Sequence, residues 1–270
     1  MSEVLKAIII GIVQGLTEFL PVSSSGHIVI AQEILNIHFS EDENLLFAIV
    51  LHFATALSTV VIFRKDIVQI IKGLFQFKNN EEFQFSLKIL LSMIPAALVG
   101  VLLKDTLEEL FSNLLVVGCM LMITSALLFF ADKAKKTGKS VQFKDSLIIG
   151  IAQGIAALLP GLSRSGSTIS TSILLGNDKS KAARFSFLMV LPLIFGATAK
   201  MILDANETGG LQIGSMNFEA LVAGFIAAFL SGLIACKWMI ELVKKAKLSY
   251  FSVYCIIVGI SVISYSLFIK

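Results

Sequence analysis

A polar break interrupts the apolar N-terminal part of the chain and recurs in its second half. The first break is QGLTEFLPVSSSGH, residues 14–27, and the second is QGIAALLPGLSRSGST, residues 153–168. An offset of 139 residues aligns Gln14 with Gln153, and after one extra residue an offset of 140 aligns the serines that follow. The chain therefore contains an internal repeat, and each half must fold around its own break.

The composition places these breaks inside a membrane protein. The chain is 56% hydrophobic and 15% charged, with a mean hydropathy of +0.87, far more apolar than an average globular domain. The net charge is only +3 and no basic stretch is interleaved with aromatic residues, so we expect no nucleic-acid partner. The cysteines lie in apolar runs without metal-ligand spacing, which indicates packing residues.

Six apolar segments are long enough for the roughly 20 residues that a bilayer-spanning helix needs. The predicted spans are residues 45–63, 84–103, 113–131, 185–203, 218–236 and 250–268. The segment that follows the first break, residues 26–35, is too short to span. It favours a re-entrant hairpin whose non-helical turn faces an internal site, because lipid cannot satisfy bare backbone groups.

The predicted fold class is an all-α polytopic membrane protein with an inverted-topology repeat. Each half contains a re-entrant helical hairpin and three transmembrane helices. The first half covers residues 1–138 with its hairpin at 1–36, and the second covers residues 139–270 with its hairpin at 146–176. Three spans per half is an odd number, so the second half should be upside down relative to the first, as in many transporters. The two hairpins should then meet near the midplane.

The charges of the loops predict the orientation. Basic residues cluster in the loops near 64–78, 133–139, 179–184 and 244–247, which the span count puts on one side. The opposite side collects acids, among them Asp105, Glu108 and Glu109. Because cytoplasmic loops are enriched in Lys and Arg, we expect the basic side in the cytoplasm of a plasma (inner) membrane protein. Both termini and the opening of the site would then be extracytoplasmic.

The first break carries groups suited to anion chemistry. Gln14 and Glu18 are four residues apart and share one helix face, and an ionised carboxylate in hydrocarbon usually marks a site. The alternative is that Glu18 stays hydrated at the headgroup interface. Ser23, Ser24 and Ser25 would present hydroxyls and backbone amides at the start of the next helix, which is where anions bind. An ordinary N-cap explains only one of these serines.

Two residues near the breaks add charge and proton-transfer capacity. His27 follows the serines directly, and we interpret it as functional rather than as a packing or capping residue. Arg164 in the second break can clamp phosphate oxygens with two parallel hydrogen bonds. The alternative interpretation is that the side chain of Arg164 extends to the membrane surface and binds nothing. Ser163, Ser165 and Thr168 add donors on the same turn, whereas His52 is interpreted as a hydrogen-bonded packing residue.

Together the breaks resemble the bacterial undecaprenyl-diphosphate phosphatases of the bacitracin-resistance type. That family carries a Glu/Gln-x-x-x-Glu motif and a PGxSRSxxT motif, which correspond here to QGLTE and PGLSRSGST. The resemblance assigns Gln14 and Glu18 to the first motif and Ser24 and His27 to the positions after it. It assigns Ser163, Arg164, Ser165 and Thr168 to the second motif. Gln14 stands where some members have Glu, which argues against a mechanism with two carboxylates there.

The resemblance implies hydrolysis of undecaprenyl diphosphate, a polyprenyl lipid, to the monophosphate with the help of a divalent cation, magnesium or calcium. We expect Glu18 and Gln14 to hold the cation and Glu18, Ser24, His27 and Arg164 to be catalytic. The substrate-binding residues would be Gln14, Ser23, Ser25, Ser163, Ser165 and Thr168.

Several alternatives stay open at this point. The nucleophile is His27, or Ser24 with His27 or Glu18 as base, or water promoted by His27. The rival function is a lipid flippase or an ion-coupled transporter, because inverted repeats with broken helices are transporter architecture. A transporter would need Arg164 and backbone amides but no nucleophile. A homodimer is compatible with the sequence, which does not fix an oligomeric state.

Overall fold

The computed structural model describes residues 1–37, 41–102, 113–135, 137–207, 217–245 and 247–268. These residues form helices and no strand, with one isolated bridge between Lys139 and Asn177. The first half contains α1 (Glu3–Phe19), α2 (Ser24–Leu35), α3 (Glu41–Ile62), α4 (Arg64–Leu74), α5 (Glu81–Leu102) and α7 (Leu114–Lys133). The second half contains α8 (Phe143–Leu158), α9 (Arg164–Leu174), α10 (Lys179–Glu207), α11 (Phe218–Lys245) and α12 (Ser249–Phe268).

Six of these helices are long and apolar enough to cross a membrane, within the part of the chain that the structure describes. They are α3, α5, α7, α10, α11 and α12, and each overlaps one predicted span. The predicted all-α membrane class is therefore confirmed. Helices α10 and α11 run beyond the predicted spans at their basic ends, because a helix continues past the apolar stretch when its polar residues can reach water.

Both predicted hairpins are present as pairs of helices separated by a short break. Helix α1 ends at Phe19 and α2 begins at Ser24, while α8 ends at Leu158 and α9 begins at Arg164. The second helix of each pair has only 12 and 11 residues, respectively. Because an α-helix rises about 1.5 Å per residue, each is less than about 20 Å long and too short to cross a bilayer alone.

Residues 64–78 were expected as a basic loop, but most of this segment is the helix α4. Its apolar residues recur with the spacing of one helix face, and Ile67 and Ile70 pack against the main core. The basic residues Arg64, Lys65 and Lys72 share the same short helix. The segment is thus an amphipathic helix, which a search for long apolar runs overlooks.

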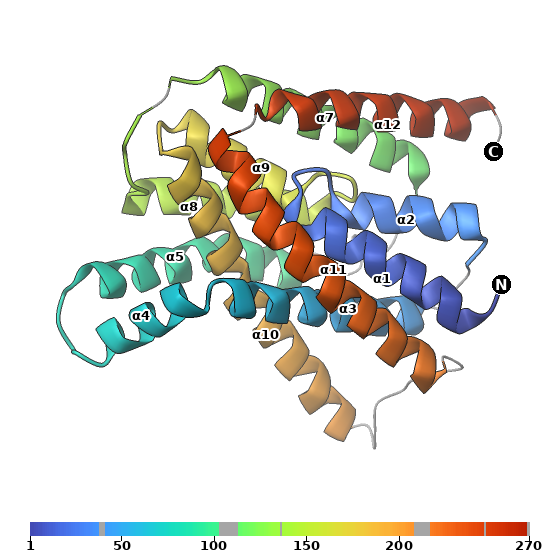
Figure 1. The fold of residues 1–270 in the computed structure, drawn as a ribbon, viewed down its shortest axis with the longest axis horizontal. Helices are drawn as coiled ribbons and strands as arrows, with labels where there is room; N and C mark the ends of the chain where they lie inside the picture. The colour runs from blue at the N-terminus through green and yellow to red at the C-terminus, as the bar shows by residue number, and fades with distance from the viewer. Residues whose placement is uncertain (38–40, 103–112, 136, 208–216, 246, 269–270) are drawn as a thin grey trace.

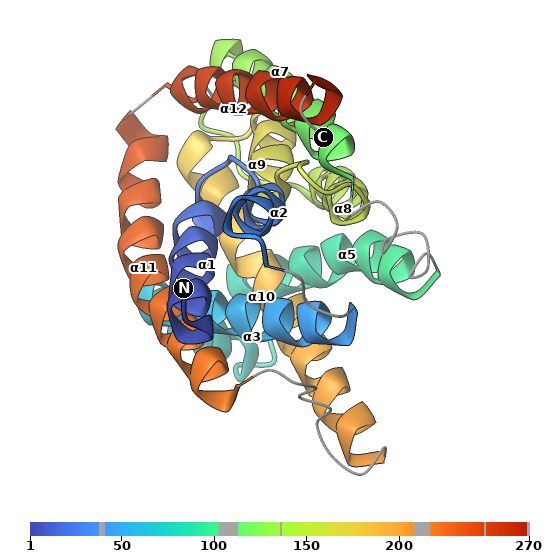
Figure 2. The same cartoon turned by 90° about the vertical axis from the view of Figure 1, so that its right-hand side faces the viewer.

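The helices pack in matched pairs across the two halves. Helix α1 of the first hairpin packs against α11, α8 of the second hairpin packs against α5, and α7 packs against α12 (Figures 1 and 2). The short helices α2 and α9 lie in the middle of the molecule, with longer helices around them (Figure 2). Each half is thus completed by the other. The division at residues 138 and 139 and the inverted relation of the halves stay predictions.

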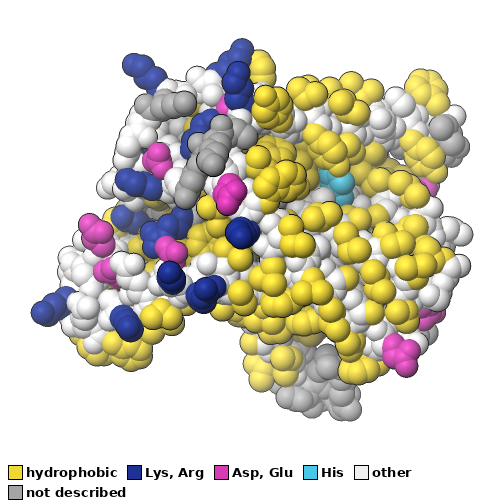
Figure 3. All heavy atoms as spheres, viewed as in Figure 1, with side chains coloured by type: hydrophobic (Ala, Val, Ile, Leu, Met, Phe, Trp, Pro, Cys, Tyr) yellow, Lys and Arg dark blue, Asp and Glu magenta, His cyan; other side chains and the backbone are white. Residues whose placement is uncertain are grey.

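The two ends of the molecule differ in charge. Both chain termini lie at the end opposite α4 (Figure 1), and Lys and Arg side chains gather at the end that carries α4 (Figure 3). Hydrophobic side chains cover most of the remaining visible face (Figure 3). The acidic segment with Asp105, Glu108 and Glu109 lies outside the described residues. The basic loops are therefore gathered at one end, as the span count requires.

Small residues let α1 and α11 approach closely. A Cβ atom added at Gly15 would lie 2.5 Å from the carbonyl oxygen of Ala228, and one added at Gly11 would lie 3.0 Å from the Cβ of Ala227. Contacts of this kind allow membrane helices to pack through their backbones. This packing fixes the position of α1, which carries Gln14 and Glu18.

We expect Gly15→Ala to lower the thermal unfolding midpoint of the purified protein in detergent. The added methyl group overfills the contact with α11, and overpacking costs about 1–3 kcal/mol. Gly196→Ala is the matched control because it also changes a glycine inside a long helix, yet its Cβ would meet nothing within 4 Å. The control should raise the midpoint slightly, since Ala favours a helix over Gly by roughly 0.5–1 kcal/mol. Equal midpoints for both variants would contradict the close packing.

Candidate functional site

The two polar breaks meet in the structure. Ser165 in the second break donates its hydroxyl to the carbonyl oxygen of Leu20 in the first, at 3.2 Å. A Cβ atom added at Gly26 would lie 3.0 Å from the Cα of Gly161. Gly161 itself has a φ of +91°, a conformation that glycine adopts without strain. The expected meeting of the hairpins is thus seen, and it brings side chains of both halves into one place.

The first serine of each cluster caps a helix. Ser23 Oγ accepts a hydrogen bond from the backbone N–H of Gly26 at 3.2 Å, and Ser163 Oγ accepts from that of Gly166 at 3.0 Å. Both serines are buried. Ser23 has a φ of 74°, which is costly for a residue with a side chain and is found where surrounding structure imposes it. Ser23 and Ser163 are therefore ordinary N-caps, and capping does not explain the other serines of the two breaks.

Glu18 is the centre of the polar cluster. Its side chain is only 7% exposed, yet both carboxylate oxygens are engaged. Oε1 accepts a hydrogen bond from Nη2 of Arg164, while Oε2 accepts from Ser24 Oγ at 2.7 Å and from Gln14 Nε2 at 3.1 Å. A buried carboxylate needs such partners, because desolvation without them is expensive. Glu18 is therefore buried within the protein and is not a hydrated surface group.

Arg164 is held by two elements besides α9. In addition to Glu18 on α1, its Nη1 donates to the carbonyl oxygen of Ser186 on α10, at 3.3 Å. The hydroxyl of Ser186 lies 2.7 Å from that of Thr168, which also donates to the carbonyl of Arg164 at 2.9 Å. The Arg164 side chain is 18% exposed. The guanidinium thus stays inside the molecule and does not extend to the surface.

His52 belongs to this cluster, although its position in an apolar span predicted a packing role. Its Nδ1 lies 3.0 Å from Gln14 Nε2 and 3.5 Å from Glu18 Oε2. An amide nitrogen only donates, so Nδ1 accepts and the proton of the neutral ring is on Nε2. The His52 side chain is 36% exposed, which makes it the most accessible member of the cluster. It links Gln14 and Glu18 to an accessible face.

His27 lies apart from the carboxylate. Its Nδ1 is 2.8 Å from the carbonyl oxygen of Ser23, and its Nε2 is 2.8 Å from the hydroxyl of Tyr254 on α12. Because a carbonyl only accepts, Nδ1 carries the proton and Nε2 accepts from Tyr254. The two rings stack with centroids 5.6 Å apart. The structure therefore gives His27 a tyrosine partner and not Ser24, Glu18 or Arg164.

Apart from His27, the predicted site residues separate into two groups. Gln14, Glu18, Ser24 and Arg164 are joined by direct hydrogen bonds. Ser23, Ser25, Ser163, Ser165 and Thr168 hold the breaks through caps and hydroxyl contacts. Sequence reasoning missed Ser186 and Tyr254 and undervalued His52. A histidine inside an apolar span was a usable signal, whereas a serine and a tyrosine in such spans carry none.

The cluster offers oxygen donors for a divalent cation. Gln14 contacts Glu18 through its Nε2, and its buried Oε1 has no hydrogen-bond partner, so the residue retains one free oxygen donor. The described residues contain no group of three or more His, Cys, Asp or Glu side chains that could hold a metal ion. A magnesium ion needs only one or two carboxylates when waters and phosphates complete its shell. The residues present fit a cation that arrives with a phosphate ligand.

The fold and the cluster define a polytopic α-helical membrane protein in which two broken hairpins enclose a carboxylate, a guanidinium and a serine. The family model described as bacitracin resistance protein BacA matches residues 7–261. The chain belongs to this family, which confirms the resemblance of its two motifs.

Relatives from three organisms match over nearly their whole length. A protein of Christiangramia forsetii is 59% identical over 265 residues, covering 98% of each chain, and one of Parabacteroides distasonis is 52% identical, covering 97% of this chain and 98% of its own. A protein of Methanococcus vannielii is 40% identical, covering 97% of this chain and 100% of its own. Each of the three is named undecaprenyl-diphosphatase.

We expect Tyr254→Phe to destabilise the protein in detergent by about 1 kcal/mol, because a typical hydrogen bond contributes that much and His27 loses its donor. The phenyl ring keeps the stacking, so the change isolates the hydroxyl. Tyr250→Phe is the matched control, since Tyr250 lies on the same helix and is 70% exposed. Thermal unfolding of both variants measures the difference. A shift of the same size in the control would show that the hydroxyl of Tyr254 has no special role.

Proposed function

We propose that this protein hydrolyses undecaprenyl diphosphate to undecaprenyl phosphate and inorganic phosphate in the plasma (inner) membrane. The observation that carries the proposal is the 2.7 Å hydrogen bond from Ser24 Oγ to Glu18, whose other oxygen contacts Arg164. A nucleophile, a base and a phosphate clamp are thereby in direct contact. The names of the relatives support the same activity. The reaction would recycle the lipid carrier of cell-wall synthesis and account for resistance to bacitracin.

In the proposed mechanism Ser24 attacks the terminal phosphorus of the diphosphate while Glu18 accepts its hydroxyl proton. The new Ser24 O–P bond forms as the bond from phosphorus to the bridging oxygen breaks, and undecaprenyl phosphate leaves with that oxygen. Water then attacks the phosphoserine, and the bond from phosphorus to the Ser24 oxygen breaks. That oxygen takes back the proton held by Glu18, which releases inorganic phosphate and restores both residues. Arg164 stabilises the charge on the equatorial oxygens in both steps. The hydroxyls and amides of the breaks position the phosphates.

Two other routes remain as alternatives within the same reaction. His27 could attack directly, but its Nε2 accepts a hydrogen bond from Tyr254, which would have to move first. Water could attack without a covalent step. A lipid flippase or ion-coupled transporter is less well supported, because the serine–carboxylate contact is not needed to bind an anion. Ser24 with Glu18 as base is therefore the preferred route.

The decisive experiment measures phosphate release from undecaprenyl diphosphate by the purified protein, together with rapid-quench trapping of labelled phosphate. We expect Ser24→Ala to lower kcat by about 100-fold or more, a typical minimum for loss of a catalytic group. Wild type should form an acid-stable adduct that this variant lacks. Ser261→Ala is the matched control, because Ser261 is an exposed residue of α12 whose hydroxyl donates to the carbonyl oxygen of Ile257 on the same helix; it should retain most activity.

Each other result identifies a different route. An acid-labile adduct that depends on His27 would reject serine attack, and normal turnover without any adduct would favour water. Lipid transport by purified protein that releases no phosphate would overturn the proposed hydrolysis.

We further propose that a divalent cation, magnesium or calcium, assists this reaction. Glu18 and the free Oε1 of Gln14 would hold it, with the substrate phosphates and waters completing its shell. When bound, such a cation neutralises charge on phosphate oxygens. The proposal agrees with the donor set, which consists of hard oxygen atoms. Ser24 and Arg164 keep the roles described above.

We expect turnover to be lost in excess chelator and restored by the cation. Glu18→Gln should abolish the metal-dependent rate, whereas Gln14→Glu should be tolerated because it keeps an oxygen donor at the same position. Activity assays over a series of magnesium and calcium concentrations measure both effects. Full activity in chelator would contradict the metal role and leave Glu18 as a base.

We also propose that the basic end of the molecule faces the cytoplasm and that both termini and the mouth of the site are extracytoplasmic. The gathering of Lys and Arg at one end supports this orientation (Figure 3). A homodimer stays a prediction that none of these arguments requires.

In a background without native cysteines, an impermeant thiol reagent added to intact cells should label Glu207→Cys. It should not label Lys135→Cys, which lies after α7 at the basic end. Permeabilised cells, in which both must react, provide the control. The reverse labelling pattern would show that the orientation is inverted.

A further inference from the structure

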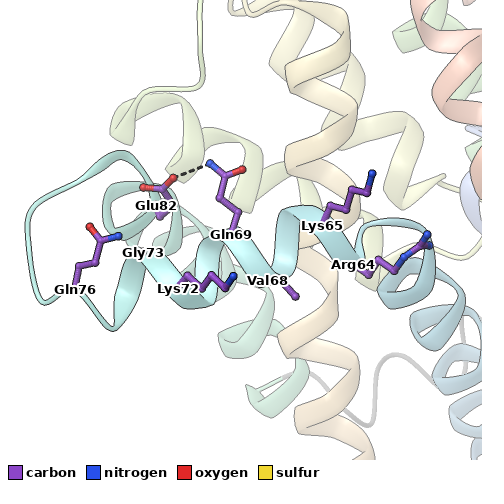
Figure 4. Close-up of a pocket in the computed structure, with 8 residues that line it drawn as sticks. All are labelled: Arg64, Lys65, Val68, Gln69, Lys72, Gly73, Gln76 and Glu82. Atoms are coloured by element: carbon purple, nitrogen blue, oxygen red, sulfur yellow. Dashed lines mark hydrogen bonds between the residues drawn. The ribbon is translucent and has the colours of Figure 1, made fainter.

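A second polar site lies on α4, at the basic end of the molecule. Residues of α4, Gln76 just after it and Glu82 of α5 line an open cavity of about 540 Å³ (Figure 4). Arg64, Lys65 and Lys72 of α4 line it together with Gln69 and Gln76, and Glu82 of α5 forms part of the wall. Helix α4 packs against α5 and α3, and none of the cavity residues belongs to the hairpins that hold Glu18 and Arg164. The cavity is therefore separate from the proposed active site.

The cavity carries excess positive charge. Arg64, Lys65 and Lys72 have no ion-pair partner among the described residues. The acid on the same helix, Asp66, is engaged elsewhere, because its carboxylate lies 2.5 Å from Nε of Arg184 on α10. Glu82 accepts a hydrogen bond from Gln69 at 2.8 Å (Figure 4). Three cations and one acid thus line the cavity, and an anionic ligand would neutralise the excess positive charge.

Exposed apolar side chains adjoin the cations. Val68 and Ile71 on α4 are 49% and 46% exposed, and Phe75 and Phe77 just after the helix are 73% and 89% exposed. Ile67 and Ile70, on another side of α4, pack against the core. An amphipathic helix with cations beside exposed apolar residues is suited to the boundary between headgroups and acyl chains. The partner should therefore have both a negative charge and an apolar body.

We propose that α4 and its cavity bind the phosphate of an anionic phospholipid in the leaflet at the basic end of the molecule. Arg64, Lys65 and Lys72 contact the headgroup, Gln69 and Gln76 offer further hydrogen bonds, and Val68 and Ile71 contact the acyl chains. Clusters of Lys and Arg at a membrane surface attract anionic lipids in this way. The ligand is a bilayer phospholipid and not the substrate, because the cavity lies outside the hairpins.

The full-length protein reconstituted in phosphatidylcholine bilayers provides the test. Spin-labelled phosphatidylglycerol and phosphatidylcholine report the relative association of each lipid with the protein. In the triple variant Arg64→Gln, Lys65→Gln, Lys72→Gln we expect the preference for phosphatidylglycerol to fall on the order of tenfold, because each surface cation contributes to attraction of anionic lipid. The matched control is Lys133→Gln, Lys135→Gln, Lys144→Gln, which removes three exposed cations from the same end. It should keep most of the preference.

The remaining outcomes also decide the proposal. An unchanged preference in the α4 variant, or an equal loss in both triple variants, would overturn it, because either result shows that no local site exists. Displacement of labelled phosphatidylglycerol by millimolar inorganic phosphate would identify a free-anion site and overturn the lipid assignment. If the α4 triple variant does not fold, single variants replace it. Lys72→Gln should then lower the preference for phosphatidylglycerol by less than the tenfold expected for all three changes, whereas Lys144→Gln should leave it unchanged.

Discussion

The contact between Glu18 and Arg164 is the interaction on which the rest of the arrangement depends. Each charge stands in an apolar hairpin, and neither has a low-energy position there alone. Their pairing places the first break against the second, and the hydrogen bonds of Ser24, Gln14 and the Ser186 carbonyl complete the requirements of both groups. Such a pair adds little net stability after desolvation. Its value is that only one relative position of the two hairpins satisfies it.

The two halves have kept one backbone plan and divided its chemistry between them. At the repeat offsets, Glu18 aligns with Ala157 and Ser24 aligns with Arg164. The helix caps, in contrast, are the same in both halves, since Ser23 and Ser163 each accept a hydrogen bond from the glycine three residues later. The repeated parts therefore build the hairpins, and the parts that differ build the site.

The sequence predicted those features that local patterns determine. Six spans follow from the length of apolar runs, and the meeting of the two hairpins follows from two polar breaks that need an internal environment. The contact of Arg164 with Glu18 was not predicted. Helix α4 was missed because its apolar residues form a stripe and not a run. His52 reaches the cluster, and Tyr254 reaches His27, only because their helices pack together. The residues next to them in the chain do not indicate these contacts. Which oxygen or nitrogen each side chain contacts was likewise beyond reach, since it depends on tertiary geometry.

The separation of Glu18 and Arg164 by 146 residues has a consequence for how the protein is made. At elongation rates of about 5–20 residues per second, the ribosome completes Arg164 roughly seven to thirty seconds after Glu18. The first hairpin is therefore synthesised without its counter-charge, and α11, the helix on which α1 packs, comes later still. During this interval the partners available to Glu18 are Gln14, Ser24 and His52 of the first half. The first hairpin is thus translated first, but its contacts with α11 and with Arg164 can form only after those parts of the second half have been made.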